Sequence, residues 1–564
     1  MNGLLGLIFF LLMRLPVGGA EEAARQDSVL SELLSQEDYE LIGENPGLLD
    51  EYRISALEYL DSLDTKGLRI QQIATFSIPR EAREEGIGFR YRLKINRSNH
   101  WEVRLLADQD PGEHFRSLPV PCVPSHLSGG FLIRPGGMVR EVIAGDFHVN
   151  IGFGAVLASA PEFVATLGEP GLLHRPGRGI RLHPGTDENR FFRGLATRLA
   201  WRQSEWILFG TGKQTAFGRD TVPQQGVGAI YKLQLTNSEW GMCVAGFQRD
   251  TLSSQDPGWE TVYREGTQTF IRSGIWGQYR LPFGILFGEA GWSPGRGTAS
   301  VAGFRLFETS GFSAVIRFTS SSPGYPVWYT LYHSGTALTR SRSRLICSWK
   351  YARNRRVAWF GLLQAETDSW PGGDRFLKPS MRTSHRLLLQ FPNRWTLTGT
   401  ATITFGESLA SRPDALNWKI QLDTDPEIKA PLRIRAGIQQ SVTGFGETPV
   451  SGITGELAAG VRFWNGKLRL ISGFRVFMVE NGVSPIYAYE PDVLYGWSAP
   501  VLSGSGTRWY LNLRWAALPG LVIEGKVYQT GYSDLKHLSE DNRGGIGGKV
   551  QVGWSMEKIK AKEE

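Results

Sequence analysis

The sequence contains little cysteine and, after its N-terminus, no long apolar run. The three cysteines, Cys122, Cys243 and Cys347, are odd in number and far apart, which excludes a disulfide framework and the close spacing of a structural metal site. Charged, polar or glycine residues interrupt every later apolar run within about ten positions, whereas a membrane-spanning helix needs about 20 apolar residues. Membrane-spanning helices are therefore not expected.

The sequence patterns of enzymes are also missing. There is no Gly-x-Ser-x-Gly elbow and no phosphate-binding loop. The nine histidines are scattered: His148 lies near Asp146, and His183 near Asp187 and Glu188, but neither has the spacing of a nucleophile or a metal ligand. We therefore expect a non-enzymatic protein with no cofactor and no metal ion.

The first 20 residues have the pattern of a secretory signal peptide. Residues 4–13 are apolar, and the small residues Gly18 and Ala20 fit cleavage before Glu21. No Lys or Arg precedes the apolar stretch, so an uncleaved anchor is the alternative. An exported chain without a second helical span is either a soluble protein outside the cytoplasm or an outer-membrane barrel.

From about residue 70 the sequence has the period of β-strands. Apolar and polar residues alternate in residues 89–96, 432–439, 467–478 and 508–515, which places the two sets on opposite faces of a strand. Tight turns such as Asn465-Gly466 and Pro519-Gly520 alternate with longer loops such as residues 320–339. Short turns on one side and long loops on the other are typical of a transmembrane barrel.

The length of the segments and the position of the tryptophans agree with a membrane barrel. The segments run for about nine to twelve residues, enough to cross a bilayer when tilted. Several tryptophans stand beside turns, as interfacial girdles require: Trp101, Trp206, Trp240, Trp395, Trp464 and Trp515. The pattern predicts an all-β fold, a large antiparallel transmembrane β-barrel of about 24 strands in the outer membrane. The alternative is a soluble exported β protein that binds sugar.

Charge divides the chain into an acidic head and a basic body. Residues 21–66 contain thirteen Asp and Glu against three Lys and Arg, whereas residues 67–564 carry a net charge of +16. Apolar residues of the head recur at helical spacing, and Asn45-Pro46 breaks the run. We expect a signal peptide at 1–20, a short α-helical acidic segment at 21–68, the barrel at 69–556 and a charged tail at 557–564.

If the apolar positions face lipid, the alternating basic residues face the lumen. A basic lumen favours anions, or it receives the acidic head; alternatively, the basic residues pair with luminal carboxylates as struts. The candidate lumen residues are Arg90, Arg92, Lys94, Arg317, Arg342, Arg344, Arg433, Arg435, Arg469, Arg475, Arg508 and Arg514.

The densest polar cluster follows a long loop rich in Gly and Pro. It contains Asp187, Glu188, Arg190 and Arg193. One interpretation is an inward-folded constriction in which the two arginines pair with carboxylates. The other is the charged start of a strand that anchors the loop.

Three body segments resemble a bacterial family of outer-membrane barrels that carry an N-terminal helix-hairpin-helix segment. They are ADQDPGE at 107–113, GDFHVNIGFG at 145–154 and DENRFFRG at 187–194. The head matches this family more loosely, through Asn45, Pro46, Leu48, Ile54, Leu57, Leu60 and Leu63. The resemblance extends over most of the chain; it implies an outer-membrane location and brings no catalytic residues.

The head departs from the family pattern at the hairpin. A DNA-binding helix-hairpin-helix uses a Gly-x-Gly hairpin, but here Asp64-Thr65-Lys66-Gly67 supplies one glycine. An acidic head also repels a polyanion, which argues against nucleic acid as a partner.

The sequence thus predicts a porin-like channel or binding barrel with a basic lumen. The expected partners are outer-membrane lipid and either anionic solutes or a periplasmic protein. Two interpretations of the acidic segment stay open, a gate in the lumen and an undocked adaptor. The alternative functions are a scaffold for another exported component and soluble sugar binding.

Overall fold

The computed structural model describes the barrel and parts of its loops. The described residues are 68–78, 87–97, 100–111, 125–159, 170–183, 185, 190–217, 220–251, 266–322, 324–326, 330, 341–354, 356–369, 379–392, 395–406, 414–424, 432–444, 449–480, 486–494, 496, 498–533 and 545–558. The predicted signal peptide, the acidic segment up to residue 67, the last six residues, Asp187 and Glu188 lie outside them. Within these ranges, no helix has the length and apolar character needed to cross a membrane.

Nearly all described elements are strands, and each pairs antiparallel with its neighbours. The strands are β1 (Leu68–Ile78), β2 (Gly88–Arg97), β3 (Trp101–Gln109), β4 (His126–Ile133), β5 (Val139–Asn150), β6 (Gly179–Leu182), β7 (Phe192–Trp201), β8 (Ser204–Phe217), β9 (Asp220–Gln234), β10 (Ser238–Thr251), β11 (Gly266–Leu281), β12 (Gly284–Ser293), β13 (Gly297–Thr309), β14 (Phe312–Ser321), β15 (Ser341–Asn354), β16 (Val357–Ser369), β17 (Ser380–Gln390), β18 (Trp395–Phe405), β19 (Ala415–Thr424), β20 (Leu432–Thr443), β21 (Val450–Phe463), β22 (Leu468–Val479), β23 (Ile486–Tyr487), β24 (Val501–Leu502), β25 (Gly504–Leu518), β26 (Leu521–Tyr532) and β27 (Ile546–Lys558). Two short 3-10 helices, η1 (Pro170–Leu173) and η2 (Trp464–Gly466), complete the described elements.

The main sheet closes into a barrel. It contains 25 strands; β5 continues in the wall to β7, while β6 pairs with β5 alone. The wall therefore has 24 strands, and it closes where β1 pairs with β27, Leu68 opposite Lys558. Closure leaves no sheet edge exposed. The predicted antiparallel barrel of about 24 strands is confirmed.

The sequence alternation corresponds to the two faces of the wall. Along β25, Trp509 and Leu511 are 38% and 42% exposed, whereas the alternating residues Arg508, Tyr510 and Asn512 are almost fully buried. The same alternation leaves large apolar side chains exposed on the outside of most wall strands. Such a surface is stable only in contact with lipid. A closed barrel with this exterior is the architecture of an outer-membrane protein, and it excludes the soluble alternative.

Aromatic side chains mark the short-turn end of the wall. Trp206, Trp240, Trp464 and Trp515 are exposed beside turns, as predicted, and Trp201 is 68% exposed at the turn after β7. Tryptophan prefers the interface between lipid and water. The short turns therefore lie at one membrane surface.

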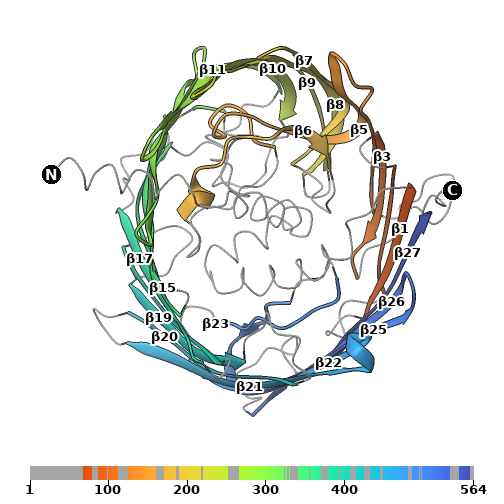
Figure 1. Ribbon diagram of the computed structural model, residues 1–564, viewed down its shortest axis with the longest axis vertical. Coiled ribbons are helices and arrows are strands. Elements are labelled where there is room, and N and C mark those ends of the chain that lie inside the picture. Colours follow the sequence, from red (N-terminus) through yellow and green to blue (C-terminus); the bar gives the residue numbers. More distant parts are fainter. Residues whose placement is uncertain are drawn as a thin grey trace, which may run out of the picture.

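Two chain segments fold into the barrel. Inner segment A comprises residues 151–159 and 170–183, with η1 and β6; inner segment B comprises residues 486–494, 496 and 498–502, with the β23–β24 hairpin. Figure 1 shows β6 and β23 inside the ring of wall strands. Neither segment was predicted as an inward-folded element of defined structure.

Inner segment A is packed on an apolar part of the inner wall. Its buried core includes Phe153, Val156 and Leu173 from the segment together with Trp276 and Phe287 from β11 and β12. The inner face of β8–β16 is thus partly apolar, although the alternation rule assigned apolar positions to the lipid side. The difference arises because the buried inner segment supplies a second apolar environment inside the barrel.

Candidate functional site

Two of the three resemblance motifs, residues 145–154 and 187–194, meet where inner segment A leaves the wall. Asp146 of β5 is buried and accepts two hydrogen bonds from the guanidinium of Arg193 on β7, at 2.6 and 2.8 Å. It also accepts bonds from the Ser128 hydroxyl at 2.8 Å and the Gly129 amide at 3.0 Å. These bonds hold β4, β5 and β7 together at the point where β5 carries the chain into the lumen.

Glycine at two motif positions permits this close approach of strands. Gly145 has φ +102°, and a Cβ there would lie 2.4 Å from the carbonyl oxygen of Gly129. Gly194 has φ +155°, and its Cβ would lie 2.2 Å from the carbonyl oxygen of Gly210. Any larger residue would clash with the backbone of the neighbouring strand.

A line of hydrogen-bonded polar side chains follows Asp146. The His148 and His183 rings are joined between Nε2 and Nδ1 at 2.8 Å, and His148 Nδ1 lies 3.3 Å from the Ser159 hydroxyl. His183 stacks on Phe191 with a centroid distance of 4.6 Å, and Lys213 Nζ lies 3.9 Å from the centre of the same ring. The motif residues His148 and Phe191 therefore contact inner segment A at Ser159 and His183.

The predicted constriction is described only in part. Arg193 pairs with Asp146, a carboxylate from β5, and Arg190 is buried nearby. Asp187 and Glu188 lie outside the described residues. Sequence reasoning singled out Arg193 but missed its partner, because the two residues are 47 positions apart.

One carboxylate of the wall holds the tip of inner segment A. Glu289 of β12 accepts hydrogen bonds from three backbone amides of the segment: those of Phe153 at 2.5 Å, Ala155 at 3.0 Å and Val156 at 3.0 Å. Glu289 is itself buried. A carboxylate that receives several backbone amides forms strong, charge-assisted bonds, so the tip is fixed in position.

Further wall side chains bind the rest of the segment. Arg317 donates to the carbonyl oxygens of Phe153 and Leu173, at 3.0 and 3.3 Å. His174 Nε2 lies 2.9 Å from Gln278 Oε1. Burial lowers the pKa of His174 to about 4, with the positive charge of Arg305 adding to the effect. His174 is therefore neutral at pH 7, and Nε2 donates to the glutamine.

Inner segment B is held by ion pairs. Glu490 is fully buried and contacts the guanidinium of Arg508 and Lys526 Nζ, the latter at 3.1 Å. Burial by itself would raise the pKa of Glu490, but Lys526 and Arg508 bring it below its ordinary value. Asp492 pairs with Lys549 at 2.7 Å. Removing one member of such a buried ion-pair network is strongly destabilising.

The candidate lumen residues lie at inward positions of the wall, and many have carboxylate partners. Arg433 and Arg435 share Asp423. The other ion pairs of this set are Arg90–Asp108, Lys94–Glu102, Arg344–Glu366, Arg475–Glu456, Arg508–Glu490 and Arg514–Glu524. Arg317 binds backbone carbonyls instead, Arg92 and Arg469 are also engaged in contacts, and the side chain of Arg342 lies outside the described residues. Many of these cations thus have carboxylate partners.

Two parts of the inner wall nevertheless carry more positive than negative charge. On β1–β3 the inward cations are Arg69, Arg90, Arg92, Lys94 and Arg104, against the acids Glu102 and Asp108. On β17–β20 they are Arg382, Arg386, Lys419, Arg433 and Arg435, against the acid Asp423. We call these the basic faces. The core clusters that include inner segments A and B contain no residue from either face.

The described part of the chain has no group of three or more His, Cys, Asp and Glu side chains that could hold a metal ion. Cys243 is buried in the inner core, and Cys347 lies on the outer face with Leu345 and Trp349.

No family model and no curated protein matches the sequence. Among solved structures, the chain is similar to a mutant of the ferric enterobactin receptor from Pseudomonas aeruginosa, with 10% identity, coverage of 87% of this chain and 82% of that chain, and a TM-score of 0.42. The FrpB iron transporter from Neisseria meningitidis has 11% identity, coverage of 88% and 83%, and a TM-score of 0.38. OccAB4 of Acinetobacter baumannii has 11% identity, coverage of 63% and 99%, and a TM-score of 0.29. This likeness concerns barrel architecture alone.

Proposed function

We propose that the chain is an outer-membrane channel that passes small anionic solutes along its two basic faces. The observation that carries the proposal is the charge imbalance of these faces, ten cations against three acids at inward positions of β1–β3 and β17–β20. Charge of one sign on a pore wall biases the sign of the ions that pass. Inner segments A and B narrow the lumen (Figure 1), and the passage that we propose runs along the basic faces.

The polar character of the β17–β20 face also favours small ions over sugars. Its inward positions carry five threonines of β18 between the arginines of β17 and the amide and basic side chains of β19 and β20. Aromatic side chains, on which sugar rings could stack, are absent from these inward positions. Hydroxyl and amide groups can replace some of the water molecules that hydrate an anion.

We further propose that the acidic segment at 21–66 rests against the basic faces and reduces the current. Its net charge of −10 is opposite in sign to theirs. Attraction between charges in contact with water weakens with salt, since screening acts over about 10 Å at 0.1 M. An undocked segment would leave the current independent of its charge.

Planar-bilayer recording of the full chain tests both statements. We expect current steps with a reversal potential that indicates anion preference in a KCl gradient. The double variant Arg386→Gln with Lys419→Gln should move the reversal potential toward zero, whereas Arg353→Gln, an exposed arginine at the end of β15, should not. A full-length variant with Asn and Gln at the thirteen acidic positions of 21–66 should conduct more.

A gel-mobility shift on heating would first establish that each variant has a folded barrel. A folded barrel without current, or with cation preference, would contradict the channel proposal; absence of current would favour the scaffold function. Unchanged current in the variant with the neutralised 21–66 segment would contradict the docking of that segment and leave the channel proposal standing.

A further inference from the structure

Three ring side chains lie together on the lipid side of β15–β17. Trp349, Trp359 and His385 come from successive strands, and their ring centroids lie 5.8 to 5.9 Å apart. His385 stacks on Trp359 at an interplanar angle of 18°. Trp359 is 41% exposed, and the other two share its side of the wall because both are in register with Gly361, two positions further along β16. We call these three side chains the ring cluster.

Gly361 allows the ring cluster to form. A Cβ at this position would lie 2.1 Å from two atoms of the Trp349 indole, so the indole lies directly over the glycine backbone. This close approach places Trp349 against both Trp359 and His385. A larger residue at position 361 would displace the indole from the wall, so the cluster depends on this glycine.

His385 is a polar side chain on a face that meets lipid. Its Nε2 lies 3.1 Å from the Thr383 hydroxyl, and among the described residues this is its one hydrogen bond. When that hydroxyl donates to Nε2, Nδ1 carries the ring proton and is left as a donor. Hydrocarbon offers no acceptor, so the acceptor that the membrane can supply here is a polar group of a lipid.

Two arginines stand at the short-turn end of the wall, next to the ring cluster. Arg353 lies at the end of β15, four positions after Trp349, and Arg356 lies in the following turn, three positions before Trp359; both are exposed. Among the described residues, neither guanidinium has an ion pair. Both are therefore accessible to a ligand at the membrane surface.

The turns on either side of these arginines contribute one acid. The β13–β14 turn adjoins β15, where the Ala352 amide donates to the Gly311 carbonyl oxygen, and it follows Glu308, which is exposed. Residues 391–394 on the other side contain no acid, and position 355 is a third arginine in the sequence. With Glu308 included, this part of the rim is still positively charged.

The arginines and the ring cluster lie at different depths. Four residues of a strand span about 13 Å, and a tilt of about 40° reduces this to about 10 Å along the membrane normal. Tryptophan prefers the interface between lipid and water. Arg353 then lies at the level of the lipid headgroups, and His385 lies where the acyl chains begin.

We propose that this face of β15–β17 binds one phospholipid molecule. Arg353 and Arg356 hold its phosphate, for which the planar guanidinium fork is suited. His385 Nδ1 donates to an ester carbonyl oxygen, and the acyl chains lie against the indoles. The site is on the outside of the wall and does not depend on the channel proposal. A bound lipid would fix this part of the wall at a defined depth in the membrane.

Native mass spectrometry of the full chain tests the site, with phosphatidylglycerol added to the protein in detergent. We expect a complex with one lipid that the double variant Arg353→Gln with Arg356→Gln weakens at least tenfold. His385→Leu should also weaken it and should leave the barrel folded, because leucine is favourable on the lipid side. A gel-mobility shift on heating checks the folding of each variant.

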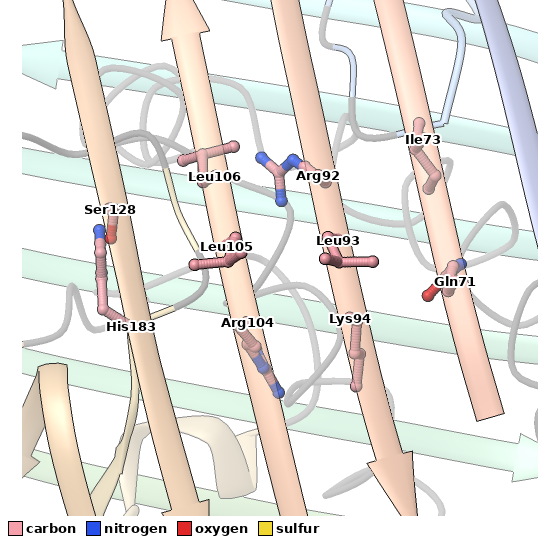
Figure 2. Close-up of a pocket in the computed structure, with 10 residues that line it drawn as sticks. All are labelled: Gln71, Ile73, Arg92, Leu93, Lys94, Arg104, Leu105, Leu106, Ser128 and His183. Carbon is pink, nitrogen blue, oxygen red and sulfur yellow. The ribbon is translucent and has the colours of Figure 1, made fainter. Parts of the chain in front are cut away.

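Arg97→Gln is the matched control, because it removes the same charge from an exposed position at the same end of the wall. Arg97 lies opposite Trp101. The outer face beside it carries Leu93 in register with Leu105 instead of the ring cluster, and Figure 2 shows these two leucines side by side on β2 and β3. This variant should retain the bound lipid.

Inorganic phosphate distinguishes a lipid from a free anion. At millimolar concentration it should not displace the phospholipid. Displacement by phosphate, together with wild-type affinity in His385→Leu, would overturn the lipid site in favour of a simple anion site. Equal lipid binding by the wild type and the double variant, or an equal loss in Arg97→Gln, would also overturn it. A two-chain complex that the same variants abolish would assign this face to a second copy of the chain instead.

Discussion

Removal of the Glu289 carboxylate should release the tip of inner segment A. In the wild-type structure this side chain accepts the amides of Phe153, Ala155 and Val156. Oε2 accepts the first two of these bonds and Oε1 accepts the third. Glu289→Ala would leave these buried donors without partners while the barrel wall, which closes through backbone pairing, remains intact.

The expected magnitude follows from the number of donors. Each buried donor that loses its acceptor costs about 1–3 kcal/mol, so three cost at least about 3 kcal/mol while the segment stays in place. The segment avoids this cost by opening into water. A change of about 3 kcal/mol raises the open population roughly 100-fold, since each 1.4 kcal/mol is a factor of ten.

Hydrogen exchange followed by mass spectrometry measures that opening directly. Peptides that cover residues 151–159 should exchange roughly 100-fold faster in Glu289→Ala, while peptides from β17–β20 should keep the wild-type rate. Glu366→Ala is the control, because Glu366 bonds Arg344 and Gln364 of the wall. Wild-type exchange at 151–159 in a folded Glu289→Ala protein would refute the role assigned to this carboxylate.

Other predictions concern the wall, the topology and pH. Leu513→Arg places a charge on the lipid side and should destabilise the barrel by about 2–4 kcal/mol near the midplane; Arg514→Leu should cost less, and equal tolerance of the two in a refolding assay would contradict the register. An even number of strands returns the chain to the side where it starts, so surface labelling of a tag after Glu564 should fail on intact cells, and efficient labelling would contradict the topology. The pKa of His174 is about 4 in the attached segment, against an ordinary value of 6.5. His174 therefore takes up a proton more readily when the segment is open than when it is attached. The attachment of segment A should therefore weaken as pH falls from about 6.5 to about 4, by at most about 3 kcal/mol. His174→Gln should reduce the pH dependence of exchange in residues 170–183, and an unchanged dependence would count against His174.

The sequence alone was enough to predict the wall of the barrel. A strand has a side-chain period of two, so residues such as Arg508 and Trp509 are assigned to opposite faces without knowledge of their neighbours. Turn residues and segment lengths gave a strand number close to the one found, because both depend on local backbone geometry. The outer-membrane location follows from the same local pattern.

Only the tertiary structure shows which side chains and segments interact inside the lumen. The partners of Glu289 lie more than 130 positions away in the sequence, and those of Asp146 lie on strands that become neighbours only when the sheet forms. Alternation assigned Arg508 to the lumen, and the polar cluster of residues 187–193 singled out Arg193, but neither pattern gave a means of choosing Glu490 or Asp146 as the partner. Pairing between distant residues is decided by the closure of the barrel, which determines which inward side chains come within hydrogen-bond distance.

The apolar inner wall shows the same division between local and tertiary information. A period of two shows that the two faces of a strand differ, but it does not show which surroundings each face meets. Phe287 lies on the inner face of β12 and is buried there because Phe153 packs on it, with ring centroids 4.8 Å apart. Inner segment A provides these surroundings only after the barrel has closed around it, because burial of an apolar side chain depends on what packs against it in space.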